Sequence, residues 1–276
     1  MGFMPNSERL PLPHRALCNR VMLKTLPWHT KIVLALLAFL PLYFLIAALG
    51  TKMGIWGWQF GLGTLTFTGG VILLGIVALA AVISLIMGLV AKPRRNGVLA
   101  AAIIGLLIPG AVFVMFTATR NTAADNPIHD VATNTSNPPA FSAETMAARE
   151  AAGANPLSDY QIPLSDLELY KSAAPELAIK SHAQIITDRY TTLQPLPLAG
   201  ASQADAVAAV AAGMGNMGFI DIRTDIASGR VEGVAESRWF GFKDDVVAQV
   251  GENEINFRSV SRVGVSDLGA NAARIG

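Results

Sequence analysis

The side chains best suited to bind or transform a ligand gather near the end of the chain, between positions 244 and 274. Two adjacent aspartates come first, and three arginines follow with serine, aspartate and asparagine side chains between them. Arginine binds phosphate or carboxylate through paired hydrogen bonds, and a carboxylate can act as a base or as a Mg²⁺ ligand. The candidate ligand-binding residues are therefore Asp244, Asp245, Arg258, Arg262, Ser266, Asp267, Asn271 and Arg274.

Two interpretations of this group remain open. Arg258 and Arg262 lie four positions apart, so they share one face of a strand, and an antiparallel return would bring them near the aspartates. They could form an ion-pair and helix-capping network, or they could join Arg274 and the first amides of a terminal helix in an anion site. We favour the network, because arginine–carboxylate pairs on sheets commonly have no further role.

A catalytic assignment has less support. Asp244 or Asp245 could serve as a base, but no histidine or cysteine lies nearby in the sequence to complete a catalytic pair. The glycines of residues 213–218 match a dinucleotide fingerprint only as a string, because they are predicted to end a helix instead of joining a strand to a helix. We assign no catalytic residue, no metal ligand and no cofactor, and we favour a non-enzymatic protein.

The first half of the chain has the composition of a membrane region. The whole sequence is 52% hydrophobic and only 15% charged, which is too apolar for an ordinary soluble protein. Continuous apolar runs at residues 32–49, 65–90 and 97–116 are each long enough to cross a bilayer as a helix. We expect three transmembrane helices within residues 32–117, the first of them an uncleaved anchor.

The distribution of charge predicts the orientation of these helices. Residues 1–119 contain nine Lys and Arg residues and one acidic residue, Glu8. Residues 120–276 contain twelve Lys and Arg residues and nineteen Asp and Glu residues. The leader at residues 1–31 and the loop at 92–96 carry most of the basic residues near the spans, so both are predicted to be cytoplasmic. Residues 118–276 then lie on the far side, in a bacterial periplasm. An acidic exported half does not suit a nucleic-acid-binding protein.

Residues 118–141 are rich in Pro, Asn and Thr, which indicates an extended polar linker. His129 and Asp130 within it could be taken for a metal or catalytic pair. Neighbouring side chains on an extended chain point in opposite directions, so the pair does not converge by itself. We favour a structural role for both residues.

The remaining residues, 142–276, show signals of both helices and strands. Ser142 and Ser202 are suited to cap helices that follow them, and residues 164–170 predict a short helix. Isoleucines alternate with charged residues over 217–226, as in a half-buried strand. Further strands are expected at 231–242, 245–250 and 255–262, with a terminal helix starting at Ser266 and Asp267. The predicted class is α+β: three transmembrane helices, then a two-layer α/β sandwich with a mostly antiparallel sheet.

Three stretches of residues 126–276 resemble the family of unknown function DUF1499 in its bacterial, membrane-anchored form. They are the segment from Phe257 to Ile275, the segment from Trp239 to Val246, and Pro127 to Asp130 with Asn137 to Phe141. Two positions depart from the family pattern: Asn134 stands where an acidic residue is usual, and Thr191 where a proline is usual. The resemblance implies a fold and a placement, and no chemistry.

These observations favour a bacterial inner-membrane protein with a periplasmic binding or scaffold module, and we expect it to be an accessory subunit of a larger membrane complex. Its expected partners are the lipid bilayer and other membrane proteins or an anionic envelope ligand, with no nucleic acid. The alternative is an envelope hydrolase or transferase that acts on a phosphate- or glycan-containing substrate through Asp245, Arg258 and Arg262.

Overall fold

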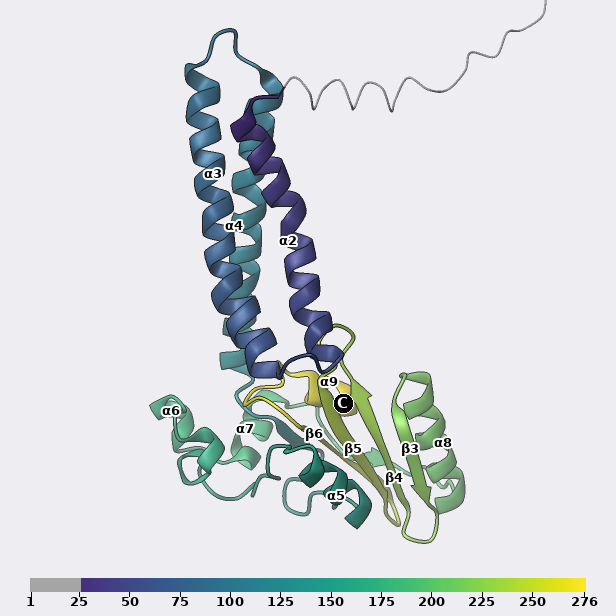
Figure 1. Cartoon of the computed structure of the whole chain (residues 1–276). Coiled ribbons are helices and arrows are strands. Elements are labelled where there is room, and N and C mark those ends of the chain that lie inside the picture. The colour runs from purple at the N-terminus through teal and green to yellow at the C-terminus, as the bar shows by residue number, and fades with distance from the viewer. Residues whose placement is uncertain (1–25) are drawn as a thin grey trace, which may run out of the picture. The chain divides into compact units, whose positions relative to one another are not determined.

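The computed structural model describes residues 26–276, and the predicted basic leader at residues 1–31 lies almost entirely outside them (Figure 1). The chain forms two compact units. One unit holds the residues up to Ala48 together with Trp58–Met115, and the other holds Leu49–Gly57 together with Phe116–Gly276.

Three long apolar helices confirm the expected transmembrane region. They are α2 (Trp28–Lys52), a π-helical segment η1 (Gln59–Gly69) that continues into α3 (Gly70–Val90), and α4 (Asn96–Asp125). Each is long and apolar enough to cross a membrane, and in each less than a third of the most apolar window is buried by the protein itself. The remaining apolar surface is suited to contact with lipid chains.

Small residues allow the three helices to approach one another closely. A Cβ atom at Gly105 of α4 would lie 2.7 Å from a methyl of Val33 and 2.8 Å from Ala81, so a side chain there would separate the helices. Polar groups add a buried contact between α2 and α3, where His29 Nδ1 lies 2.8 Å from Ser84 Oγ. This combination of small residues and hydrogen bonds is typical of helix packing in membranes.

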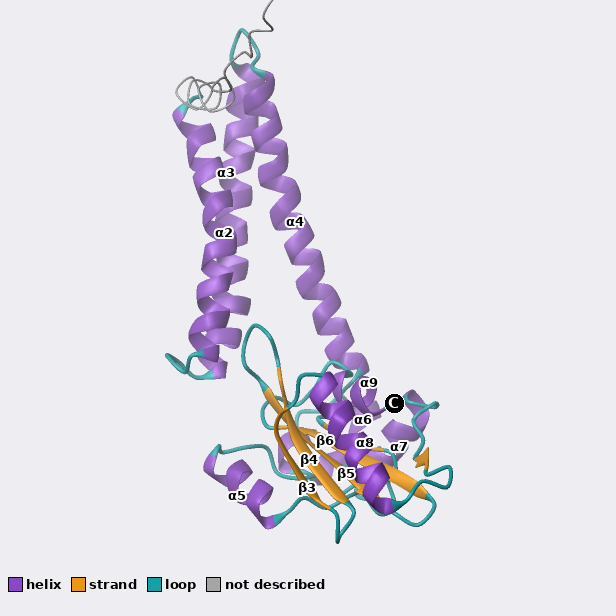
Figure 2. Ribbon diagram, turned by 90° about the vertical axis from the view of Figure 1, so that its right-hand side faces the viewer, coloured by secondary structure: helices purple, strands orange, loops and turns teal. Residues whose placement is uncertain are grey.

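The second unit contains an antiparallel sheet in the order β1-β6-β5-β4-β3, which confirms the α+β class (Figure 2). The strands are β1 (Asp130–Ala132), β3 (Ile220–Asp225), β4 (Arg230–Glu236), β5 (Lys243–Val250) and β6 (Glu254–Ser261). A short β2 (Leu196–Pro197) also pairs with β6. The first strand of the domain therefore pairs with the last, at the edge of the sheet.

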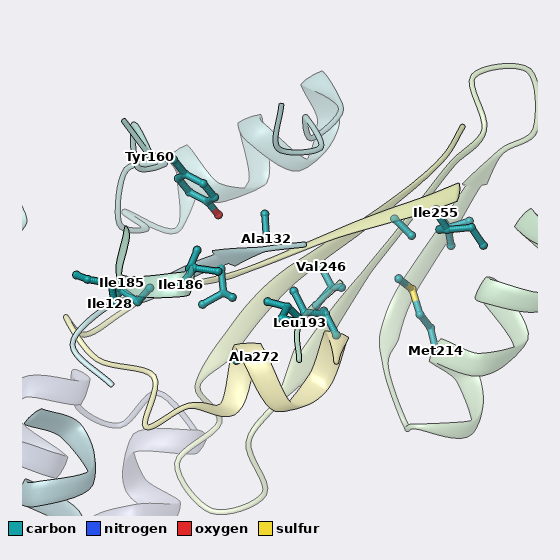
Figure 3. Packing of buried hydrophobic residues seen from close by; sticks show 14 of the residues in the cluster. Ile128, Ala132, Tyr160, Ile185, Ile186, Leu193, Met214, Val246, Ile255 and Ala272 are labelled. Atoms are coloured by element: carbon teal, nitrogen blue, oxygen red, sulfur yellow. The ribbon is translucent and has the colours of Figure 1, made fainter. Parts of the chain in front are cut away.

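The main hydrophobic core lies between one face of the sheet and three helices, and Figure 3 shows part of it. The helices are α7 (His182–Arg189), α8 (Gln203–Asn216) and α9 (Ala270–Ile275). Val231, Val246 and Ala248 of the sheet face this core and are at most 2% exposed. The Ser202 hydroxyl accepts a hydrogen bond from the Asp205 amide, which confirms the predicted cap of α8.

The opposite face of the sheet is covered by a different kind of contact. Helix α5 (Ala143–Ala151) and the segment after it lie there, with Ser142 as the predicted N-cap. Only a small apolar cluster forms on this side, from Phe141, Val247 and Val260 with Leu157. Shorter elements complete the domain: η2 (Leu164–Asp166), η3 (Glu168–Tyr170) and α6 (Pro175–Ala178).

The segment predicted to be an extended linker, residues 118–141, differs from that expectation. Helix α4 continues to Asp125, and residues Ile128 to Ala132 are almost fully buried. Ile128 and Val131 supply apolar side chains to the core, and the β1 backbone gains a partner in β6. Burial and strand pairing thus outweigh the polar composition that predicted a solvated arm.

The terminal helix also starts later than expected, at Ala270 instead of Ser266. Leu268 and Gly269 have φ angles of 58° and 81°, in the left-handed region that interrupts a right-handed helix. Asp267 instead accepts hydrogen bonds from the amides of Gly269 and Asn271, so it still lies at the positive end of α9.

Candidate functional site

Three carboxylates are buried on the sheet face that α5 covers. The register pairs Val260 with both Asp130 and Asp245, so these two aspartates lie on either side of one valine and share its face. Glu232 lies one row away on the same face, opposite Val247. Asp130, Asp245 and Glu232 are 0%, 1% and 3% exposed, so each needs a partner that offsets its lost hydration.

Asp130 is held by Arg258 through two parallel hydrogen bonds. Arg258 Nε lies 3.0 Å from one carboxylate oxygen and Nη2 lies 2.7 Å from the other. The Tyr160 hydroxyl donates a third bond at 2.5 Å, and the Ser158 amide donates a fourth at 3.0 Å. Burial by itself would raise the pKa of Asp130, but Arg258 and these donors outweigh it and hold that pKa below its ordinary value.

Asp245 lies between two arginines. Arg149 of α5 donates from Nη1 at 2.6 Å, and Arg262 donates from Nε and Nη2 at 2.9 and 2.6 Å. The second guanidinium nitrogen of Arg149 donates to the carbonyl of Asn155, 2.7 Å away. Asp245 therefore fastens α5 and the end of β6 to the middle of the sheet.

Glu232 has the same role for the beginning of α5. Its carboxylate accepts hydrogen bonds from the Ser142 amide and hydroxyl at 2.5 and 2.6 Å, and from the Thr145 hydroxyl at 2.6 Å. Arg223 of β3 lies 3.6 Å away. The N-cap serine of α5 thus binds the sheet as well as its own helix.

The other predicted residues form a polar network around α9. Arg274 pairs with Asp244 at 2.8 Å, and the side-chain amide of Asn271 donates from Nδ2 to the carbonyl of His129 at 2.8 Å. The Ser266 hydroxyl donates to the carbonyl of Asn126 at 2.6 Å. Burial is the main reason that the pKa of Asp267 rises to about 6.

Two histidines lie beside the Asp130 pair in an aromatic cluster. His129 Nδ1 is 2.5 Å from the Tyr170 hydroxyl, and burial lowers the pKa of His129. His182 is 0% exposed and stacks on Tyr160 with ring centroids 5.6 Å apart. Neither ring nitrogen of His182 has a hydrogen-bond partner in residues 26–276, and burial lowers its pKa to about 4.

The arrangement brings each predicted arginine into an internal pair with a carboxylate, while Asp267 accepts hydrogen bonds from backbone amides. The partners are Arg258 with Asp130, Arg262 with Asp245, and Arg274 with Asp244. Arg258 thus pairs with the linker aspartate, and not with Asp244 or Asp245 as expected. No group of three or more metal-ligating side chains is present in the described part of the chain. This geometry is that of an ion-pair network, and an anion-binding role for these residues stays a prediction.

Three members of this network were not identified from the sequence: Arg149, Tyr160 and Glu232. The available signal was weak in each case. Glu232 is the one charged residue within the stretch 231–235 of β4, whose other members are Val, Gly and Ala, and this pattern marks a charge inside a core. Arg149 lies on the face of α5 that also carries Thr145, four positions before it.

Comparison with family models confirms the family resemblance noted in the sequence. The model of a family described as "Protein of unknown function (DUF1499)" matches residues 130–276, which is more than half of the chain. A search of curated proteins found no match, and neither did a search of solved structures.

Replacing Asp130 by asparagine tests the network. The Asp130→Asn substitution keeps the shape of the side chain but leaves Arg258 buried without a counter-charge, so the free energy of unfolding should fall by about 3–5 kcal/mol. The matched control is Lys180→Ala, which breaks the exposed Lys180–Asp188 pair and should cost at most about 1 kcal/mol. Denaturant unfolding of the full chain in detergent measures both. Equal losses in the two variants would contradict a stabilising network.

His182 should make the fold sensitive to acid. Its pKa of about 4 in the folded protein lies below 6.5, the ordinary value, so its share of stability is complete above pH 6.5 and is lost as the pH falls towards 4. Between pH 7.5 and 5 this loss is about 2 kcal/mol. His182→Phe keeps the ring stack, loses no hydrogen bond, and should remove this part of the pH dependence.

The comparison of wild type with His182→Phe at each pH isolates the effect. Asp267 has an opposite effect, since its raised pKa favours folding as the pH falls, but it is present in both proteins. Unfolding curves at pH 7.5 and 5 should show a stability difference that grows in favour of the variant. A difference that does not change with pH would contradict the proposed titration.

Proposed function

The chain belongs to the DUF1499 family, and we propose that it is a membrane-anchored protein whose C-terminal domain binds or scaffolds other components and catalyses no reaction. The single observation that carries this proposal is the internal pairing of the candidate residues. A site for catalysis needs at least one polar group that is free to meet the substrate. Here each candidate arginine is bonded to a carboxylate of the same domain.

The alternative, an envelope hydrolase or transferase, depends on Asp245 as a base or Mg²⁺ ligand. Asp245 is 1% exposed, and both of its oxygens accept hydrogen bonds from arginines. A base must reach the proton that it removes, and a metal ligand needs a free lone pair directed at the ion. The geometry therefore supports the alternative less well than a binding role.

We further propose that the domain is exported. The basic residues Lys92, Arg94 and Arg95 follow α3, whereas the other connection, from the end of α2 to η1, has only Lys52, the last residue of α2. The positive-inside rule then assigns the 92–96 loop to the cytoplasm and residues 126–276 to the opposite side. In a bacterium this is the inner membrane with the domain in the periplasm.

A binding or scaffold role also fits the membrane region. In the described parts of α2, η1, α3 and α4, charged side chains occur only towards the ends: Lys31, Lys52, Arg120 and Asp125. An ion or proton pathway usually requires ionisable groups at membrane depth. Anchoring is the simpler role, and the protein would then serve as an accessory subunit of a larger envelope complex.

A pair of reporters tests the proposed orientation. Alkaline phosphatase fused after Gly276 should be active, because it matures only outside the cytoplasm, and a fluorescent protein that folds only in the cytoplasm should stay dark there. The same reporters inserted after Arg95 should give the reverse result. Cytoplasmic activity of the fusion after Gly276 would overturn the export of the domain.

Purification in mild detergent tests the proposed role. The full chain should retain a stoichiometric protein or lipid component through size-exclusion chromatography, detected as added mass by native mass spectrometry. A chain that ends at Asp125 keeps the apolar helices and should lose any component held by the domain. A strictly monomeric full-length protein with nothing bound would contradict a binding or scaffold function.

A further inference from the structure

An exposed aromatic turn joins β4 to β5 at residues 237–242 and takes no part in the buried network. Trp239 is 54% exposed, and the Arg238 guanidinium lies over its ring at 5.3 Å. The rings of Phe240 and Phe242 stack with centroids 5.2 Å apart. The Phe242 amide donates to the Ser237 hydroxyl at 2.8 Å, so the turn has a defined conformation.

A second apolar loop lies at the same end of the sheet. The Arg262 amide donates to the carbonyl of Lys243 at 2.9 Å, so the end of β6 lies beside the beginning of β5 and close to the aromatic turn. The loop that follows β6 exposes Val265 and Leu268, which are 43% and 46% accessible. Together, Trp239, Phe240, Val265 and Leu268 form what we call the apolar edge of the domain.

The chain enters the domain at Asn126, next to the loop that carries Val265 and Leu268. Asn126, directly after α4, accepts hydrogen bonds from the Ser266 hydroxyl at 2.6 Å and from the Tyr190 hydroxyl at 2.8 Å. The apolar run of α4 ends at Phe116, ten residues earlier, and α4 is helical to Asp125. A helix rises 1.5 Å per residue, so Asn126, to which Ser266 is bonded, follows Phe116 by about 15 Å of helix within the same unit.

We propose that the apolar edge rests in the interfacial layer of the bilayer that anchors the chain. Tryptophan prefers this layer because its ring is apolar and its N–H is polar, and arginine can keep its charged group in water beside it. The short helical stretch from Phe116 to Asp125 and the bond between Asn126 and Ser266 connect this edge directly to the membrane anchor, so the proposal needs no further binding partner. The proposal rests on the membrane anchoring in the proposed function, and it applies to either side of the membrane.

The opposite end of the sheet supplies a matched control. Ile226, in the turn between β3 and β4, is 57% exposed, nearly the same as Trp239. The seven residues of β4 separate the two turns, which corresponds to about 23 Å. Asp225 and Ser228 surround Ile226, and their side chains bond to each other at 2.6 Å. This turn has the polar surroundings expected of a loop in water.

A fluorophore attached to single cysteines in the full chain tests the proposal. In a Cys18→Ser background reconstituted into phospholipid nanodiscs, Trp239→Cys and Ile226→Cys are each labelled with an environment-sensitive dye. The dye at position 239 should be quenched by nitroxide-bearing lipids and protected from iodide in the water. The dye at position 226 should show the opposite pattern. Val265→Cys provides a second position that should behave like 239.

Two results would overturn the proposal. Equal quenching at positions 239 and 226 would show that the apolar edge has no preference for lipid. Protection from iodide at 239 without quenching by nitroxide lipids would show that protein, and not lipid, covers the edge. A failure of the reporter test for export would leave these outcomes unchanged, since that test concerns the side of the membrane and not the contact with it.

Discussion

The domain depends on the burial of a carboxylate, Asp130, at the edge of the sheet. A carboxylate without water is tolerated only if hydrogen bonds and an opposite charge replace its hydration, and Arg258, Tyr160 and Ser158 supply both. These partners come from a strand and a loop that are remote from β1 in the sequence. The pair therefore fixes a strand of only three residues in its place and joins three distant parts of the chain.

The same principle extends across the covered face of the sheet. Asp245 and Glu232 hold α5 to the sheet through an ion pair and hydrogen bonds. Only a small apolar cluster lies on this face of the sheet. Such contacts demand accurate geometry, because a missing partner leaves a buried charge. The many charged and polar residues between positions 244 and 274 therefore have a structural explanation, since they serve as partners for buried groups of the same domain.

Much of the architecture could be predicted from the sequence, because it follows from local patterns. The apolar runs predicted the long helices, and the caps at Ser142 and Ser202 predicted two starts of helices. The partner of Arg258 could not be predicted, since the register that pairs it with Val247 and Ala132 also directs it towards Asp130, 128 residues away. Strand β1 was not predicted for the same reason. It lies within the polar stretch 118–141, and its burial depends on pairing with the distant strand β6.

The position of β1 beside β6 has a consequence for biosynthesis. The first strand of the domain to leave the ribosome has its backbone partner in the last strand, so it stays unpaired until translation is almost complete. Contacts between such distant parts of a chain also form slowly, because a long loop must close first. A message interrupted before Arg258 would yield anchored helices followed by a chain that cannot fold, which proteases can recognise and remove.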